Sequence, residues 1–178
     1  QVEATQRPQR APKKQLPIYQ VNTQGGFLDS SPQFVKDLNF PNQSQEITDI
    51  NLGKGLIYSN ETAILSLHNN TITFQNGPSP NNTQPHSGDQ LQALASTFVS
   101  TLGLPQPPKL TKIEFLKLSG EDTVPVTDAS DAQFAKFNFA YSTQSIPIIS
   151  PSIGVSATYD LFGNLRELAV KYLDVKDP

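Results

Sequence analysis

Residues 89–105 have the sequence DQLQALASTFVSTLGLP, and this stretch decides the fold that we expect. Its apolar side chains recur every three or four residues, which is the pattern of a helix with one apolar face. Gly103 can adopt the left-handed conformation that ends a helix, and Pro105 prevents its continuation. The pattern therefore predicts a helix over Asp89–Leu102, with an apolar stripe made of Leu91, Leu94, Ala95, Phe98, Val99 and Leu102.

A shorter stretch upstream repeats part of this pattern. Residues 34–41, FVKDLNFP, match residues 98–105, FVSTLGLP, at four apolar positions, and both end in a proline. Ser31 can cap the N-terminus of this first helix, and Pro32 suits its first helical position. Two helices of this kind, each followed by a run of strands, favour a tandem duplication of a helix-plus-meander module.

Strands are expected after each helix. Asn69-Asn70 and the glycine-containing segment Asp160–Asn164 have the residues of hairpin turns. Short runs rich in β-branched and aromatic residues predict the strands themselves. We expect these strands at Glu46–Leu52, Gly55–Tyr58, Ala63–Leu67, Thr71–Gln75, Lys112–Leu118, Phe134–Tyr141, Ile153–Tyr159 and Leu165–Leu173.

The elements together predict an α+β fold, with two helices packed on antiparallel sheet. Residues 1–15 form a polar N-terminal tail or linker with two prolines and four cationic side chains. Residues 16–80 form a first α+β half and residues 87–178 a second one. The loop rich in Pro, Asn and Ser at residues 76–88 separates the halves within one compact unit.

Composition excludes several classes of function. The net charge is −3, which makes nucleic acid and anionic membrane poor partners. No apolar run approaches the roughly 20 residues that span a bilayer. Cysteine is absent, so disulfides, thiolate nucleophiles and sulfur-ligated metals are excluded. Methionine is absent too, which favours a processed or excised chain that lost a signal peptide or membrane anchor.

We find no constellation that supports catalysis, metal binding or cofactor binding. His68 and His86 stand in turn-like surroundings without the paired spacing of a zinc motif, and we expect both to be solvated. Glu121-Asp122 and the pair Asp128 and Asp131 lack the spacing of a calcium loop. A turn capped by Asp128, with Asp131 in solvent, explains the latter pair. We therefore expect no enzyme, and a carbohydrate-active hydrolase is the third-ranked alternative.

The second half resembles the PepSY-like and YycI-like extracytoplasmic domains of bacteria. The residues that carry this resemblance are Phe137-Asn138-Phe139-Ala140-Tyr141, Ile146-Pro147-Ile148, Val155-Ser156-Ala157-Thr158-Tyr159-Asp160 and Gly163-Asn164-Leu165. It covers residues 89–175 and, more weakly, the first half. The resemblance implies a non-catalytic module that lies outside the membrane and binds or regulates other proteins. It implies no active-site residues.

A surface rich in Asn, Gln, Ser and Thr favours an extracytoplasmic location. The sequons at Asn42, Asn60, Asn69 and Asn81 are attributed to chance in a chain of this composition. The leading hypothesis is a non-catalytic interaction or structural domain, with a protein partner or self-assembly through its N-terminal arm. Leu16, Ile18 and Tyr19 are the candidate interaction residues, because they could add a strand to a neighbour's sheet edge. The alternative is a membrane-tethered regulator that binds a sensor kinase or protease, with any membrane contact made through an upstream anchor.

Overall fold

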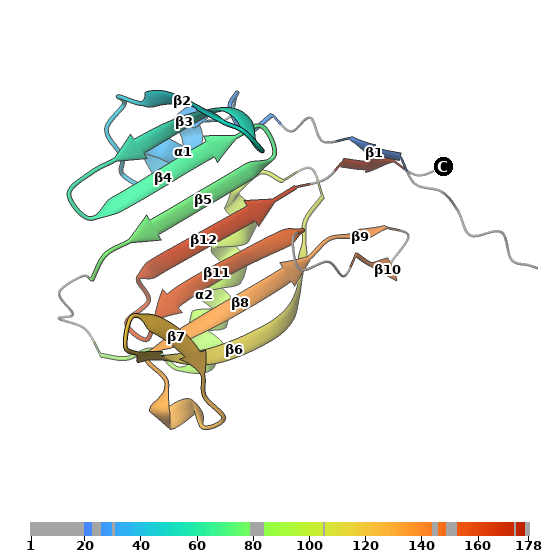
Figure 1. The fold of residues 1–178 in the computed structure, drawn as a ribbon. Coiled ribbons are helices and arrows are strands. Elements are labelled where there is room, and N and C mark those ends of the chain that lie inside the picture. The colour runs from blue at the N-terminus through green and yellow to red at the C-terminus, as the bar shows by residue number, and fades with distance from the viewer. Residues whose placement is uncertain are drawn as a thin grey trace, which may run out of the picture.

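The computed structural model describes residues 20–22, 26–29, 31–78, 84–104, 106–143, 146–148, 153–172 and 174–176. A nine-stranded antiparallel sheet dominates this part of the chain, with strand order β2-β3-β4-β5-β12-β11-β8-β6-β7 (Figure 1). Its strands are β2 (Gln45–Asp49), β3 (Gly53–Ser59), β4 (Ala63–His68), β5 (Thr71–Asn76), β6 (Lys109–Ser119), β7 (Asp122–Pro125), β8 (Phe134–Ala140), β11 (Gly154–Asp160) and β12 (Leu165–Lys171).

Two runs of strands meet in the middle of the sheet. The first run is β2 to β5, and the second contains β6, β8, β11 and β12. They join where β5 pairs antiparallel with β12, with Phe74 opposite Leu168 and Ile72 opposite Val170. Because these four side chains are buried, a continuous apolar core crosses the junction.

One face of the sheet is apolar and carries both helices. A row of directly paired residues crosses this face through Leu65, Phe74, Leu168, Ala157 and Phe137. Helix α2 (Gly88–Thr101) lies over β8 and β11, and its buried residues are Leu91, Ala95 and Val99. Figure 1 shows α1 (Ser31–Asp37) and α2 behind the sheet. Phe40, which follows α1, packs edge-on against Phe74, with ring centroids 6.1 Å apart.

The opposite face is polar and has no helix over it in the described structure. The neighbouring row crosses this face through Ser66, Thr73, Ala169, Ser156 and Asn138. The strands therefore alternate between apolar and polar residues, as expected for a sheet with one face against the core. This alternation is what made most of the strands predictable.

The predicted fold class, α+β with two helices packed on antiparallel sheet, is wrong. Among the described residues α2 is a helix of 14 residues, whereas α1 has only 7, about two turns. Asn39 takes a left-handed conformation with φ of 56° directly after α1, which stops the helix early. The expected similar halves are also unequal, since β7 and the 3-10 helix η1 (Ala129–Asp131) occur in the second run of strands alone.

The prediction for α2 itself is confirmed. Ser87 caps its N-terminus in a capping box: the Gln90 N–H donates to the Ser87 hydroxyl at 3.3 Å, and the Ser87 N–H donates to Gln90 Oε1 at 2.8 Å. Gly103 follows the helix with φ of 62°, as its sequence position predicted. Leu94 and Phe98, however, are not fully covered: Leu94 is 40% exposed and Phe98 half-buried.

Two short strand pairs lie outside the main sheet. Strand β1 (Gln20–Asn22) pairs antiparallel with β13 (Asp174–Lys176), so segments near the two ends of the sequence lie side by side (Figure 1). Strands β9 (Ser142–Thr143) and β10 (Ile146–Pro147) form the second pair. In the part of the chain that the structure describes, neither helix is long and apolar enough to cross a lipid bilayer.

Candidate functional site

The two ends of the main sheet differ in how they are protected against pairing with another strand. The last strand at one end is β7, which pairs with residues Leu116 to Ser119 of β6. The rest of β6 has no strand on its outer side in the described structure, and β6 carries Lys109, Lys112 and Lys117. The pairing of β6 with β8 also shifts register between Leu110 and Lys112. Lysines and irregular register are features that keep an edge strand from pairing with other chains. This end of the sheet is therefore protected.

The other end, β2, lacks these features. Its five residues, QEITD, include neither lysine nor proline, and they pair with β3 in unbroken register from Gln45↔Ile57 to Asp49↔Gly53. Of the strands in the main sheet, β3 is its one neighbour. The outer edge of β2 is consequently a regular row of backbone groups that another strand could pair with.

The hydrogen bonds of the next strand pair tell which residues of β2 face outward. The Asn60 N–H donates to the Ala63 carbonyl at 3.0 Å, which places residue 60 in a hydrogen-bonded pair with β4. Alternation along β3 then directs Gly55 and Ile57 toward β2. Their partners on β2 are Ile47 and Gln45. Glu46 and Thr48 alternate with these residues along β2, so their N–H and C=O groups point away from β3 and toward the open side.

An apolar turn extends this edge. The Asp49 carboxylate accepts hydrogen bonds from the N–H groups of Asn51 at 2.7 Å and Leu52 at 2.8 Å, which fixes the turn between β2 and β3. The hydrogen bonds from Leu52 and Asn51 lower the pKa of Asp49 and so favour its charged form. The turn presents Ile50 fully to solvent and leaves Leu52 partly exposed. Two apolar side chains at one turn tip form a small contact surface.

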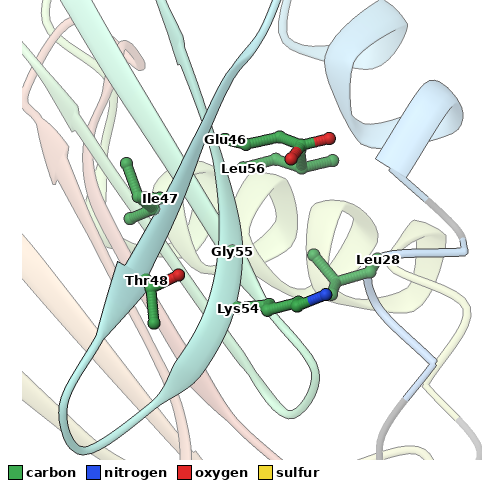
Figure 2. Close-up of a pocket in the computed structure, with 7 residues that line it drawn as sticks. All are labelled: Leu28, Glu46, Ile47, Thr48, Lys54, Gly55 and Leu56. Atoms are coloured by element: carbon green, nitrogen blue, oxygen red, sulfur yellow. The ribbon is translucent and has the colours of Figure 1, made fainter.

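A pocket of about 400 Å³ lies beside the same edge and is shown in Figure 2. Glu46 and Leu56 lie side by side in it, Lys54 extends toward Leu28, and Ile47 points to the other side of β2 (Figure 2). The remaining lining residues are Thr48 and Gly55. Neither Glu46 nor Lys54 forms an ion pair with any described residue. The pocket thus combines two aliphatic side chains with two charges that are available to a partner.

Gly55 and His68 hold the hairpin β2–β3 close against β4. They are directly opposite each other, and a Cβ atom on residue 55 would lie 2.5 Å from His68 Cε1 and 2.8 Å from the Leu67 carbonyl oxygen. Only a glycine leaves room for this imidazole. His68 is 4% exposed, and its Nε2 lies 3.4 Å from the Ser66 hydroxyl. The expectation that His68 is solvated is therefore wrong, because the missing side chain at Gly55 creates the space that buries it.

A second concavity, of about 730 Å³, runs along α2. It owes its apolar character to the part of the predicted helix stripe that the sheet does not bury, Leu94 and Phe98, together with Leu165. Burial raises the pKa of Tyr159 to about 12. The groove is lined by Asp37, Leu38, His86, Gln90, Ala93, Leu94, Thr97, Phe98, Thr101, Tyr159, Gly163 and Leu165.

The acidic residues singled out in the sequence have structural roles or lie in solvent. Asp128 caps η1 by accepting from the Ser130 N–H at 2.9 Å, and Asp131 is exposed, which confirms the turn interpretation. Glu121 and Asp122 are exposed where β6 turns into β7. Across the described ranges, no group of three or more His, Cys, Asp or Glu residues is placed to hold a metal ion.

The predicted interaction residues Leu16, Ile18 and Tyr19 lie outside the described residues, as does the sequon residue Asn81. The open edge of β2 was not predicted. The sequence indicates a strand at Glu46–Leu52, but nothing in those residues tells which strands are neighbours. The signals that could have found it are the lack of lysine in QEITD and the three lysines of β6.

Comparison with known proteins finds no similar protein: no family model, no curated protein and no solved structure matches this chain.

Proposed function

We propose that this protein is a non-catalytic interaction domain, and that the outer edge of β2 binds an extended segment of a protein partner. The observation that carries the proposal is the contrast between the two ends of the sheet. The β6 end has lysines, a register shift and a covering strand, whereas β2 has none of these. One end of this sheet is protected against pairing with other chains, whereas the other end has a regular, open edge strand. This contrast favours selective addition of a partner's strand at the open edge.

The edge supplies both affinity and selectivity. Glu46 and Thr48 each offer one N–H and one C=O group to an added strand, and each hydrogen bond contributes about 0.5–1.5 kcal/mol. Side chains of the added strand would meet the pocket at Leu28 and Leu56. Burial of the exposed Ile50 side chain adds about 1.5–3 kcal/mol. Main-chain pairing thus gives general affinity, and the pocket and turn tip select the partner.

An experiment that does not require the natural partner to be known tests this proposal. Random peptides displayed on phage are selected against the full chain, and the enriched peptides are measured against variants of β2. Thr48→Pro removes an outward N–H without changing an inward ladder bond, so we expect binding to weaken about tenfold or more, the equivalent of about 1.4 kcal/mol. Thr48→Ala keeps the N–H and serves as the matched control, with binding expected to stay within about threefold of the unmodified chain.

Thermal unfolding of both variants shows whether the sheet is intact. The proposal fails if no peptide is enriched. It also fails if the enriched peptides bind the Thr48→Pro variant as tightly as the Thr48→Ala variant, because the site would then lie elsewhere.

A further inference from the structure

The charge of the chain is divided unevenly between its N-terminal segment and the rest. Residues 1–19 hold four of the 13 Lys and Arg residues and one of the 16 Asp and Glu residues. Their formal charge is therefore +3, and that of the other 159 residues is −6. A basic segment joined to an acidic body is attracted to acidic surfaces of other copies.

The open edge is itself acidic. Glu46 and Asp49 are the charged residues of β2, and both carboxylates have exposed surface. If two β2 strands paired with each other, these negative charges would come together, which is unfavourable. An added strand that brings positive charge is favoured for the same reason.

The sequence KKQLPI, residues 13–18, has the pattern that this edge requires. In an extended strand alternate residues share one side, so Lys14, Leu16 and Ile18 face one way. The same alternation applies to the backbone groups, so Pro17, which has no N–H, belongs to the other set. A strand that pairs through Lys14, Leu16 and Ile18 therefore leaves the proline on its free edge, where proline is tolerated.

The side chains of this strand match the pocket of Figure 2. An aliphatic residue such as Leu16 suits the wall made by Leu28 and Leu56, and the Lys14 ammonium suits the Glu46 carboxylate, which has no ion pair with the described residues. This complementarity concerns charge and apolar area at alternate positions of the same strand, Lys14 and Leu16. It distinguishes KKQLPI from a strand of unrelated sequence.

We infer that residues 13–18 of one copy of this chain bind the β2 edge of a second copy, which links copies head to tail. This inference rests on the proposed function of β2. Strand β1, which begins at Gln20, pairs with β13 and not with β2, and Figure 1 shows the two strands apart. A head-to-tail contact of this kind produces rings or open chains of subunits.

Sedimentation velocity of the full chain over a range of concentrations tests the inference. We expect the mass to rise with concentration. Leu16→Asp should weaken association about tenfold or more, because it places a charge in the apolar pocket. Lys14→Glu should weaken it about fivefold through repulsion by Glu46, and the double variant Lys14→Glu with Glu46→Lys should restore it.

The matched control is Lys13→Glu, which changes the net charge by the same amount on the other side of the strand. Association of this variant should stay within about twofold of the unmodified chain. A chain that stays monomeric at all concentrations would overturn the inference. Equal weakening by Lys13→Glu and Lys14→Glu would also overturn it, because the attraction would then be unspecific.

Thr48→Pro separates failure of this inference from failure of the proposed function. If Thr48→Pro dissociates the assembly while Leu16→Asp and Lys14→Glu leave it intact, β2 is the binding edge but residues 13–18 are not its partner. If all three variants leave a concentration-dependent assembly intact, the assembly does not use β2, and the inference is wrong. The peptide selection against β2 then decides the proposed function on its own.

Discussion

Asp49 fixes the turn that extends the candidate site beyond the end of β2. Its carboxylate accepts hydrogen bonds from two backbone N–H groups and so presents Ile50 and Leu52 at the tip of the turn. Aspartate is common in such turns because its side chain can bond the backbone two residues on. The turn at the candidate site thus follows from the local sequence Asp49-Ile50-Asn51-Leu52 and is predictable from it.

Asp49 also gives a pH-dependent prediction. Because hydrogen bonding lowers its pKa from 3.8, the charged form stabilises the folded state. This contribution is fully present above the ordinary aspartate pKa and is lost as the pH falls through the lowered value. We expect Asp49→Ala to unfold at lower urea concentration than the unmodified chain at neutral pH, and the difference to shrink below that value. Asp131→Ala serves as the control, since Asp131 accepts no hydrogen bond among the described residues. A difference between Asp49→Ala and the unmodified chain that does not depend on pH would contradict the assignment.

His68 shows where residue-by-residue prediction stops. Its position before Asn69-Asn70 correctly indicated a turn, but its burial depends on Gly55, which is 13 residues earlier and reaches it through strand pairing. Nothing in the local sequence joins these residues. The environment of a turn residue is predictable from sequence only when its neighbours in the chain are also its neighbours in space.

At the scale of elements, the long helix was the most predictable part of the molecule. Its apolar period and its C-terminal glycine agree, and both were visible in the sequence. The cap at Ser87 was not predicted. The length of α1 was overestimated, because a few apolar residues do not distinguish a helix of two turns from one of three. The strands β7, β9, β10 and β13 have two to four residues each, too few for an alternating pattern to show.

Helix α2 supports a prediction on stability. Ser87→Ala removes the hydroxyl that accepts from the Gln90 N–H, so we expect the free energy of unfolding to fall by about 1 kcal/mol in urea titrations. Ser96 lies exposed within α2, and Ser96→Ala is the matched control. Because alanine favours helix over serine, this control should be neutral or slightly stabilising. Equal destabilisation by both changes would show that the cap contributes nothing specific.

At the scale of the whole molecule, the pairing of β5 with β12 determines which strands lie at the edges of the main sheet. The first run, β2 to β5, could be predicted as a series of hairpins, since each of its turns joins consecutive strands. The junction joins residues about a hundred positions apart, with Phe74 opposite Leu168, and no periodic pattern indicates it. This junction places β2 and β7 at the two ends of one sheet. The candidate site therefore depends on the sheet topology. Its residues were predicted to form a strand, but their place at the edge of the sheet was not predicted.

Hydrogen exchange of individual backbone amides of the full chain, followed by NMR with and without a selected peptide at saturation, tests the central claim most directly. The account predicts that the outward amides of Glu46 and Thr48 exchange fast in the free protein and slow by about tenfold or more when the peptide is bound. The amide of Ile47, which pairs with Gly55, should be slow in both states. Unchanged exchange at Glu46 and Thr48, with protection appearing along the α2 groove instead, would contradict the claim that β2 is the binding edge.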